Sequence, residues 1–317
     1  MKTVAVFGAS GRQGLAQVRQ LTQAGYKVRA ISRSPDPFYG EDFPDVEVMP
    51  ADLTSDASVR AAVDGMDAVF YTHPLRAHDP NTIERASKAA WVARVGRASA
   101  DAGVGRVVWQ TSSWIPDRPG DPGTYASNTE AINALWRTGA PATVFGSVLF
   151  MDNLLTNWAR PFIVREDRYV YPHSPELEAN WISLDDVARY MIAALDRPDL
   201  EGAWLNIGGP QRMRGPDVAQ SLSEALGRPI KYDPCTPQQF GELLAGAYGD
   251  DMSPEEHAAV AQRIADFYIY NNTAPTQPFK VNVDAVQERI PLELETMSQW
   301  AKRQDWTESN RPRPPAG

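Results

Sequence analysis

Short apolar segments alternate with longer amphipathic segments over the first 150 residues of the chain. The apolar segments are rich in Val, Ile and Phe, which favours buried strands, and the segments between them have the spacing of helices. The strands predicted in this way cover residues 2–7, 27–32, 46–50, 68–71, 106–110 and 142–146. Strands that alternate with helices are typical of a parallel sheet with crossover helices, so the sequence predicts a doubly wound α/β fold.

The predicted helices of this region have recognisable ends. One over 12–24 stops at Gly25, and one over 83–102 stops at Gly103. Glycine readily takes the left-handed conformation that closes a helix at its C-terminus. The two glycines therefore support both helix assignments.

The regular alternation ends near residue 150. A stretch rich in Trp and Tyr over 158–181 precedes a helix over 184–196, with Ser183 as its N-cap, and a short strand over 203–207. The remaining helices are predicted over 215–226, 237–247, 254–270, 284–289 and 294–302. These elements indicate a smaller, mostly helical C-terminal lobe.

A glycine-rich segment lies where the first strand passes into the first helix. Gly8 allows a tight turn, Gly11 lets the backbone approach a pyrophosphate, and Gly14 lets the helix pack close to the sheet. The start of the helix offers N–H groups and a positive dipole end to phosphates. The segment is the dinucleotide-binding pattern of a Rossmann domain. The cofactor contacts expected from it are Gly8, Ser10, Gly11, Arg12, Gln13 and Gly14.

The end of the second strand indicates which dinucleotide binds. NAD-binding domains carry an acidic residue there for the ribose 2′-hydroxyl, whereas this chain has Ser32 and Arg33. Because a guanidinium and hydroxyls suit a 2′-phosphate, the sequence predicts NADP(H), with Arg12 as a second candidate for that phosphate. Asp52 and Leu53, after the third strand, are expected beside the adenine.

The domain division follows from this cofactor site. We expect residues 1–155, with 184–208 returning to them, to form the NADP-binding domain. Residues 156–183 and 209–306 are expected to form a substrate lobe, and 307–317 a disordered tail.

Composition narrows the classes of partner. A net charge of −9 disfavours a nucleic-acid or anionic membrane surface. The lone Cys235 allows no internal disulfide, no apolar run reaches the length of a membrane span, and the first strand starts too early for a signal peptide. We therefore expect a cytoplasmic monomer or homodimer that binds neither nucleic acid nor a membrane and has no metal site.

These motifs together resemble the NmrA-like family of atypical short-chain dehydrogenases, which includes triarylmethane-dye reductases and quinone reductases. The resemblance extends over about residues 1–305, and the matching segments are 8–14, 32–33, 71–74, 107–113, 140–145, 150–154, 180–188 and 206–210. It implies that Thr72 and His73 lie along the cofactor and that 150–154 lies beside the nicotinamide.

One departure from the resemblance concerns proton transfer. Most short-chain dehydrogenases pair a tyrosine with a lysine four residues later, and none of the 11 tyrosines here has one. Many NmrA-like reductases instead carry a lysine near the start of the helix after the fifth strand, where this chain has Asn128. Because no lysine occurs from residue 89 to 230, the sequence excludes a lysine-assisted relay formed within that region.

Other residues then become candidates for the site. Those for catalysis are Tyr125, Ser112 or Ser113, His73 and Asn128, and Asn128 is also expected to contact the cofactor. Residues expected to line an aromatic substrate pocket are Trp114, Phe150, Met151, Asn153 and Trp181.

The function expected from these features is an NADPH-dependent reductase of a quinone, dye or enone. Such acceptors stabilise the added electrons themselves, so orientation against the cofactor can supply much of the catalysis. Two alternatives stay open: a non-catalytic NADP-sensing regulator that binds a protein partner, and a carbonyl or alcohol dehydrogenase that uses Tyr125.

Overall fold

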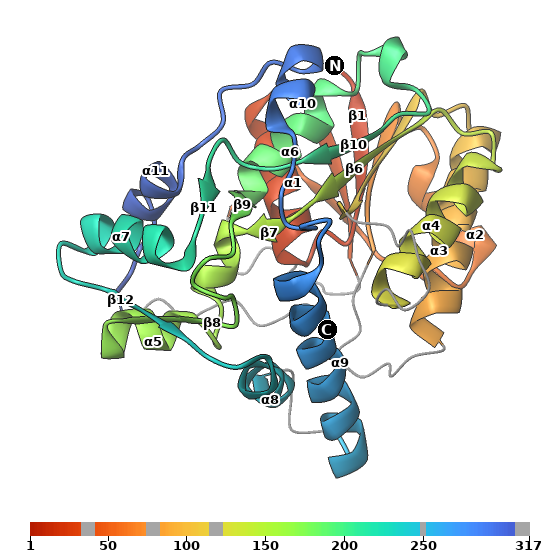
Figure 1. Ribbon diagram of the computed structural model, residues 1–317. Coiled ribbons are helices and arrows are strands. Elements are labelled where there is room, and N and C mark those ends of the chain that lie inside the picture. The colour runs from red at the N-terminus through yellow and green to blue at the C-terminus, as the bar shows by residue number, and fades with distance from the viewer. Residues whose placement is uncertain (33–41, 74–82, 114–122, 248–251, 308–317) are drawn as a thin grey trace.

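The computed structural model describes residues 1–32, 42–73, 83–113, 123–247 and 252–307, without the side chains of 83–87 and 123–126. A parallel sheet of seven strands lies at the centre of this part of the chain (Figure 1), in the order β10-β6-β5-β4-β1-β2-β3. The strands are β1 (Thr3–Phe7), β2 (Lys27–Ile31), β3 (Glu47–Met49), β4 (Ala68–Thr72), β5 (Arg106–Ser112), β6 (Ala142–Ser147) and β10 (Trp204–Ile207). The predicted doubly wound fold is confirmed. The strand expected at 203–207 is β10, which pairs with β6 at the edge of the sheet.

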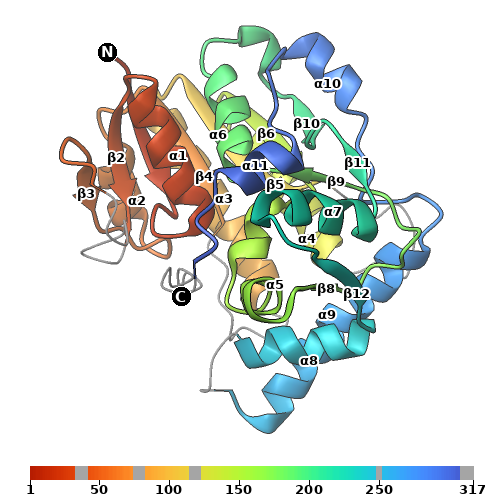
Figure 2. The ribbon, with the colours of Figure 1, turned by 90° about the vertical axis from the view of Figure 1, so that its left-hand side faces the viewer.

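Helices cover both faces of the sheet (Figures 1 and 2). On one face lie α1 (Arg12–Gln23) and α6 (Leu184–Ala193), which pack against each other. On the other face lie α2 (Asp56–Val63), α3 (Ile83–Asp101) and α4 (Gly123–Trp136), with α3 against both neighbours. Each face has its own apolar core, illustrated by Leu15 and Val187 on the first and by Val59 and Val92 on the second. Because the sheet is parallel, α1, α3 and α4 all begin at the edge where the strands end.

The C-terminal lobe combines helices with short strands. Its elements, together with the connections into it, are β7 (Leu149–Phe150), η1 (Met151–Leu155), α5 (Arg160–Glu166), β8 (Arg168–Tyr171), β9 (Ala179–Ile182), η2 (Pro198–Leu200), β11 (Arg212–Met213), α7 (Gly215–Leu226), β12 (Lys231–Pro234), α8 (Pro237–Ala247), α9 (Pro254–Thr273), α10 (Val283–Arg289) and α11 (Met297–Lys302). Strand β9 lies between β11 and β7, and β12 pairs with β8. A third core, rich in aromatic side chains, joins these elements.

Two differences from the sequence prediction have clear physical causes. The last helix begins at Met297 instead of residue 294, because Thr296 and Gln299 form a capping box that starts it there. The short strands β7, β8, β9, β11 and β12 were not predicted. Strand β8 pairs with β12, which lies about 60 residues later in the chain, so no local sequence pattern indicates the pair.

No helix in the described ranges is long and apolar enough to cross a lipid bilayer.

Candidate functional site

The glycine loop connects β1 to α1, and its geometry requires glycine at two positions. Gly8 has a φ of +78°, in the left-handed region that other residues avoid. A Cβ placed on Gly14 would lie 2.1 Å from the carbonyl oxygen of Gly8. The N–H of Gly11 donates to that same oxygen over 2.9 Å. The loop is therefore a tight turn against which the first turn of α1 packs directly.

The start of α1 is suited to an anion. Its N-cap, Gly11, provides no capping side chain, and its first turn contains no acidic residue. A helix start without a capping side chain or an acidic first turn offers its N–H groups and a positive dipole end to an anion, so the loop fits a pyrophosphate.

The ends of β2 and β3 lie next to the loop. Ser32 is buried, and its N–H donates to the carbonyl oxygen of Met49 over 3.1 Å. Asp52 is exposed, and its Oδ1 accepts hydrogen bonds from the N–H and the hydroxyl of Thr54 over 2.8 and 2.7 Å. Leu53 packs partly against the apolar core. Arg33 lies outside the described residues, so its contact with a 2′-phosphate stays a prediction.

At the end of β4, Thr72 and His73 lie between the loop and α3. The Nε2 of Gln17, on α1, donates to the hydroxyl of Thr72 over 2.9 Å, which ties the helix to the strand. His73 is 9% exposed, and its Nδ1 lies 3.0 Å from the hydroxyl of Tyr71. Burial and the nearby positive charge of Lys88 lower the pKa of His73 to about 3. His73 is therefore neutral near pH 7, so it carries no imidazolium proton to donate at that pH.

Asn128, near the start of α4, is fully buried. Its Oδ1 accepts a hydrogen bond from the hydroxyl of Thr111 on β5 over 3.1 Å, and a second from the ammonium of Lys88 on α3. Its Nδ2 has no partner among the described residues. The site thus contains a buried amide whose oxygen accepts two hydrogen bonds and whose nitrogen donates none to the described residues.

The contact of Lys88 brings to Asn128 a lysine from outside the lysine-free segment. Lys88 lies one residue before that segment, and the packing of α3 on α4 brings its ammonium to Asn128. Sequence reasoning missed this residue because it compared lysines by position in the chain, whereas the relevant neighbour comes from another helix.

The remaining candidates on this side surround the end of β5. Ser112 is half-buried, and the N–H of Ser113 donates to the carbonyl oxygen of Ser147 over 2.9 Å. A Cβ on Gly146 would lie 2.7 Å from the Cα of Ser113, so glycine allows this close approach of β6. Tyr125 lies in α4 without a described side chain, and Trp114 lies outside the described residues. Their roles stay predictions.

The described residues that were expected to line the aromatic substrate pocket are split between surface and core. Phe150 and Asn153 are half-buried, whereas Met151 and Trp181 are each 1% exposed and belong to the aromatic core of the second lobe. The rings of Trp181 and Tyr171 are 5.3 Å apart in an edge-on arrangement. Among the described members of this set, Phe150 and Asn153 are the two that keep part of their surface exposed.

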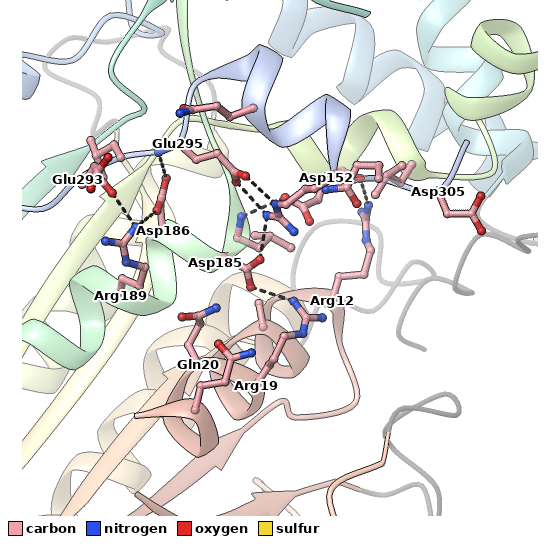
Figure 3. Close-up of a pocket in the computed structure, with 18 of the residues that line it drawn as sticks. Arg12, Arg19, Gln20, Asp152, Asp185, Asp186, Arg189, Glu293, Glu295 and Asp305 are labelled. Carbon is pink, nitrogen blue, oxygen red and sulfur yellow. Dashed lines mark hydrogen bonds and ion pairs between the residues drawn. The ribbon is translucent and has the colours of Figure 1, made fainter. Parts of the chain in front are cut away.

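A cavity of about 800 Å³ lies between α1, α6 and α11, with Arg12 among the residues that line it (Figure 3). Its charged side chains bind one another: Arg19 with Asp185 over 2.8 Å, Arg303 with Asp185 over 2.8 Å, and Arg189 with Asp186 over 2.8 Å. Burial raises the pKa of Asp186. Sequence reasoning missed this cavity because its walls come from separate segments without a shared motif.

The fold and the glycine loop define a dinucleotide-binding protein of the Rossmann type. The model of the NmrA-like family matches residues 1–302, and the chain belongs to that family. This confirms the resemblance inferred from the motifs. No group of three or more His, Cys, Asp or Glu in the described part of the chain could hold a metal ion.

Known relatives and solved structures agree with this family assignment. The chain is 29% identical over 244 residues to an NAD(P)H azoreductase of Xenophilus azovorans, which covers 77% of this chain and 80% of the relative. The triphenylmethane reductase of Citrobacter sp., solved with NADP(H), has a TM-score of 0.71 at 19% identity, covering 95% of this chain and 99% of that one. NmrA, a negative transcriptional regulator solved with NAD, has a TM-score of 0.72 at 17% identity, covering 96% and 98%. The predicted oxidoreductase class is that of the first two proteins.

Proposed function

We propose that this chain is an NADPH-dependent reductase that transfers a hydride to an aromatic or conjugated small molecule of the quinone, dye or enone type. The observation that carries the proposal is the arrangement at one edge of the sheet. The uncapped start of α1, with Gly8 and Gly14, lies at the same edge as the buried polar group of Thr111 and Asn128. Ligands of doubly wound folds bind at the carboxyl ends of the strands, where these residues meet.

Different residues bind different parts of the cofactor NADPH in this proposal. The loop from Gly8 to Gly14 holds the pyrophosphate, Ser32 and Arg33 bind the 2′-phosphate, and Asp52 and Leu53 lie at the adenine. NADPH, when bound, supplies the hydride. Near the nicotinamide end, Asn128 and Ser112 offer neutral hydrogen-bond donors, and Phe150 offers an apolar surface for an aromatic acceptor.

The acceptor class follows from the absence of a titrating acid at the described ends of β4 and β5. His73 is neutral and buried, and the Ser112 hydroxyl is a weak acid. Quinones, azo dyes and cationic dyes need little proton donation during hydride transfer, because their conjugated systems accept the electron pair. The names of the azoreductase and of the triphenylmethane reductase fit this class.

The test is a steady-state assay of NADPH oxidation with quinones, azo dyes, triphenylmethane dyes and enones, each compared with simple aldehydes and ketones. Turnover of at least one conjugated acceptor, at a kcat/KM well above that for simple carbonyls, is the expected result. A preference for simple carbonyls favours the dehydrogenase that uses Tyr125.

A regulator remains the second candidate, and the charged cavity beside α1 and α6 is the observation that favours it. NADP that binds tightly without turnover of any acceptor in the same panel would favour this candidate over a reductase.

A further inference from the structure

Lys88 is a charged residue of the site that belongs to none of the motifs described above. It lies near the start of α3, next to the start of α4, and both helices begin at the edge of the sheet where the cofactor loop lies (Figure 1). Its ammonium donates to the Oδ1 of Asn128. The structure thus brings a positive charge from α3 to the buried amide on α4.

The hydrogen bonds of Asn128 determine what that charge does. Its amide oxygen accepts one hydrogen bond from an ammonium and one from the Thr111 hydroxyl over 3.1 Å. Two donors on the oxygen, one of them charged, polarise the amide and make its N–H groups stronger donors. The Nδ2 that carries these groups is buried and has no partner among the described residues. Because buried polar atoms are normally hydrogen-bonded, an unused donor of this kind indicates a place for a ligand acceptor atom.

We propose that Lys88 is a positioning residue that acts through Asn128, and that the polarised amide of Asn128 donates to the acceptor oxygen or nitrogen that gains negative charge during reduction. This inference rests on the proposed function. In the step concerned, a C–H bond of bound NADPH would break and its electron pair would pass with the hydrogen to the acceptor, so NADPH would be oxidised to NADP⁺ and the acceptor reduced. The new bond to hydrogen forms on the acceptor, and the conjugated end of a neutral quinone, azo or enone acceptor takes the negative charge. A solvent proton then neutralises that end, so no side chain has to give up a proton.

The surrounding groups fit this role. The positive charge of Lys88 also faces His73, which is buried, so it favours neutral histidine at the end of β4. Lys88 is half-buried, and an ammonium in that position stabilises negative charge more strongly than a fully exposed one because the local dielectric is lower. Asn128, unlike a lysine at the same position, stays neutral and passes the influence of the charge on without titrating.

The first test compares kcat and KM of the wild type with those of Lys88→Met. Loss of the ammonium is expected to lower kcat about 10- to 100-fold with little change in KM. This is less than the roughly 10²- to 10³-fold lost with a direct donor to a developing charge, because Lys88 acts through Asn128. Lys27→Met is the matched control. Lys27 is exposed at the first residue of β2, at the end of the sheet where the strands begin, and its loss removes the same charge. Lys88→Arg should keep most of the rate. The double variant Lys88→Met/Asn128→Lys, which moves the ammonium to α4, should recover much of it.

The second test needs no turnover. The probe 4-nitrophenol is titrated in the presence of the protein and saturating NADP⁺, and its ionisation is followed by absorbance. The wild type should lower the apparent pKa of the bound probe by about one unit or more relative to Lys88→Met, because the phenolate oxygen imitates the charged acceptor. Lys27→Met should behave as the wild type does.

These measurements separate the two proposals. If the wild type reduces no acceptor, the proposed reductase is wrong, while the phenolate titration still decides the role of Lys88. An unshifted probe in the wild type, or the same shift in Lys88→Met, overturns the role of Lys88. So does a loss of kcat in Lys88→Met that comes with an equal loss of NADP⁺ affinity and a lower unfolding midpoint, because that pattern describes a structural residue.

Discussion

Arg12 donates a hydrogen bond from Nη1 to the carbonyl oxygen of Asp152 over 2.9 Å, and so joins the first turn of α1 to η1 (Figure 3). The Oδ2 of Asp152 in turn accepts the N–H of Leu184, at the start of α6, over 3.0 Å. Burial raises the pKa of the Asp152 carboxyl, and the Leu184 N–H and the charge of Arg12 oppose this shift. One residue of the glycine loop thus holds the segment expected beside the nicotinamide.

This contact gives a prediction that separates the two roles considered for Arg12. Arg12→Ala removes a charged donor to a carbonyl oxygen and should lower the free energy of unfolding by about 1.5–3 kcal/mol. The ratio of NADP(H) to NAD(H) affinity should stay the same, because the guanidinium is directed at Asp152. Urea unfolding and calorimetric titration measure the two quantities. A selective loss of NADP(H) affinity would instead identify Arg12 as a ligand of the 2′-phosphate.

A second prediction concerns Arg33. Arg33→Ala should weaken NADP(H) binding by about 1.5–3 kcal/mol and leave NAD(H) nearly unchanged, since only NADP(H) has the phosphate that the guanidinium would bind. Calorimetric titration of both cofactors measures the effect, with Arg60→Ala, an exposed position on α2, as the control. An equal loss for both cofactors contradicts the assignment of Arg33 to the 2′-phosphate.

A third prediction concerns the glycine loop. Gly11→Val should abolish NADP(H) binding while the protein stays folded, because the branched side chain enters the space of the pyrophosphate. Gly14→Ala should impair folding itself, since its Cβ would lie 2.1 Å from the Gly8 carbonyl oxygen. Gly246→Ala is a matched control, because a Cβ there meets nothing within 4 Å. Calorimetry and circular dichroism distinguish the three outcomes. Normal cofactor affinity in folded Gly11→Val would show that the phosphates bind elsewhere.

The glycine loop was predictable from the sequence because the residues that form it are close together in the chain. A strand, a turn that needs glycine at fixed offsets, and a helix follow one another within about 20 residues, so spacing alone identifies them. The central strands β1, β4, β5 and β6 were predictable for a related reason, since each is a short apolar run that is buried on both faces of the sheet.

The contacts of the site depend on packing between elements and have no such signal. Lys88 and Asn128 are 40 residues apart and meet because α3 packs on α4. Met151 and Trp181 carry the aromatic and apolar character expected of a substrate pocket, yet this same character places them in the core of the second lobe. Sequence shows residue type, whereas the choice between core and pocket is made by the tertiary fold.

A fourth prediction concerns acid stability and depends on His173. It is 3% exposed among the rings of Tyr171, Trp181 and Phe279, and burial lowers its pKa to about 3. In the unfolded chain a histidine has a pKa near 6.5. Below that pH the histidine is protonated in the unfolded state, whereas His173 stays neutral in the folded state. The contribution of His173 to stability is therefore complete above about pH 6.5 and falls by about 2 kcal/mol at pH 5.

His173→Phe keeps a ring in this position and removes the titration. Its unfolding free energy should therefore fall about 2 kcal/mol less than that of the wild type between pH 7.5 and pH 5. Urea unfolding at the two pH values measures the difference. If both proteins lose the same stability, the acid sensitivity arises from other groups.

The last prediction is that turnover needs no tyrosine acid. Tyr125→Phe should lower kcat by less than about tenfold, whereas the loss of a true general acid costs about 10²- to 10⁴-fold. Asn153→Leu, at the half-buried position beside the expected nicotinamide, should cost more than Tyr125→Phe, because a shift of about 1 Å between reacting atoms can cost 10²-fold. Steady-state rates with a quinone or dye acceptor, together with NADP(H) affinities, measure both variants. A loss of about a thousandfold in Tyr125→Phe at unchanged cofactor affinity would make Tyr125 the acid, and the chain would then be better described as a carbonyl dehydrogenase.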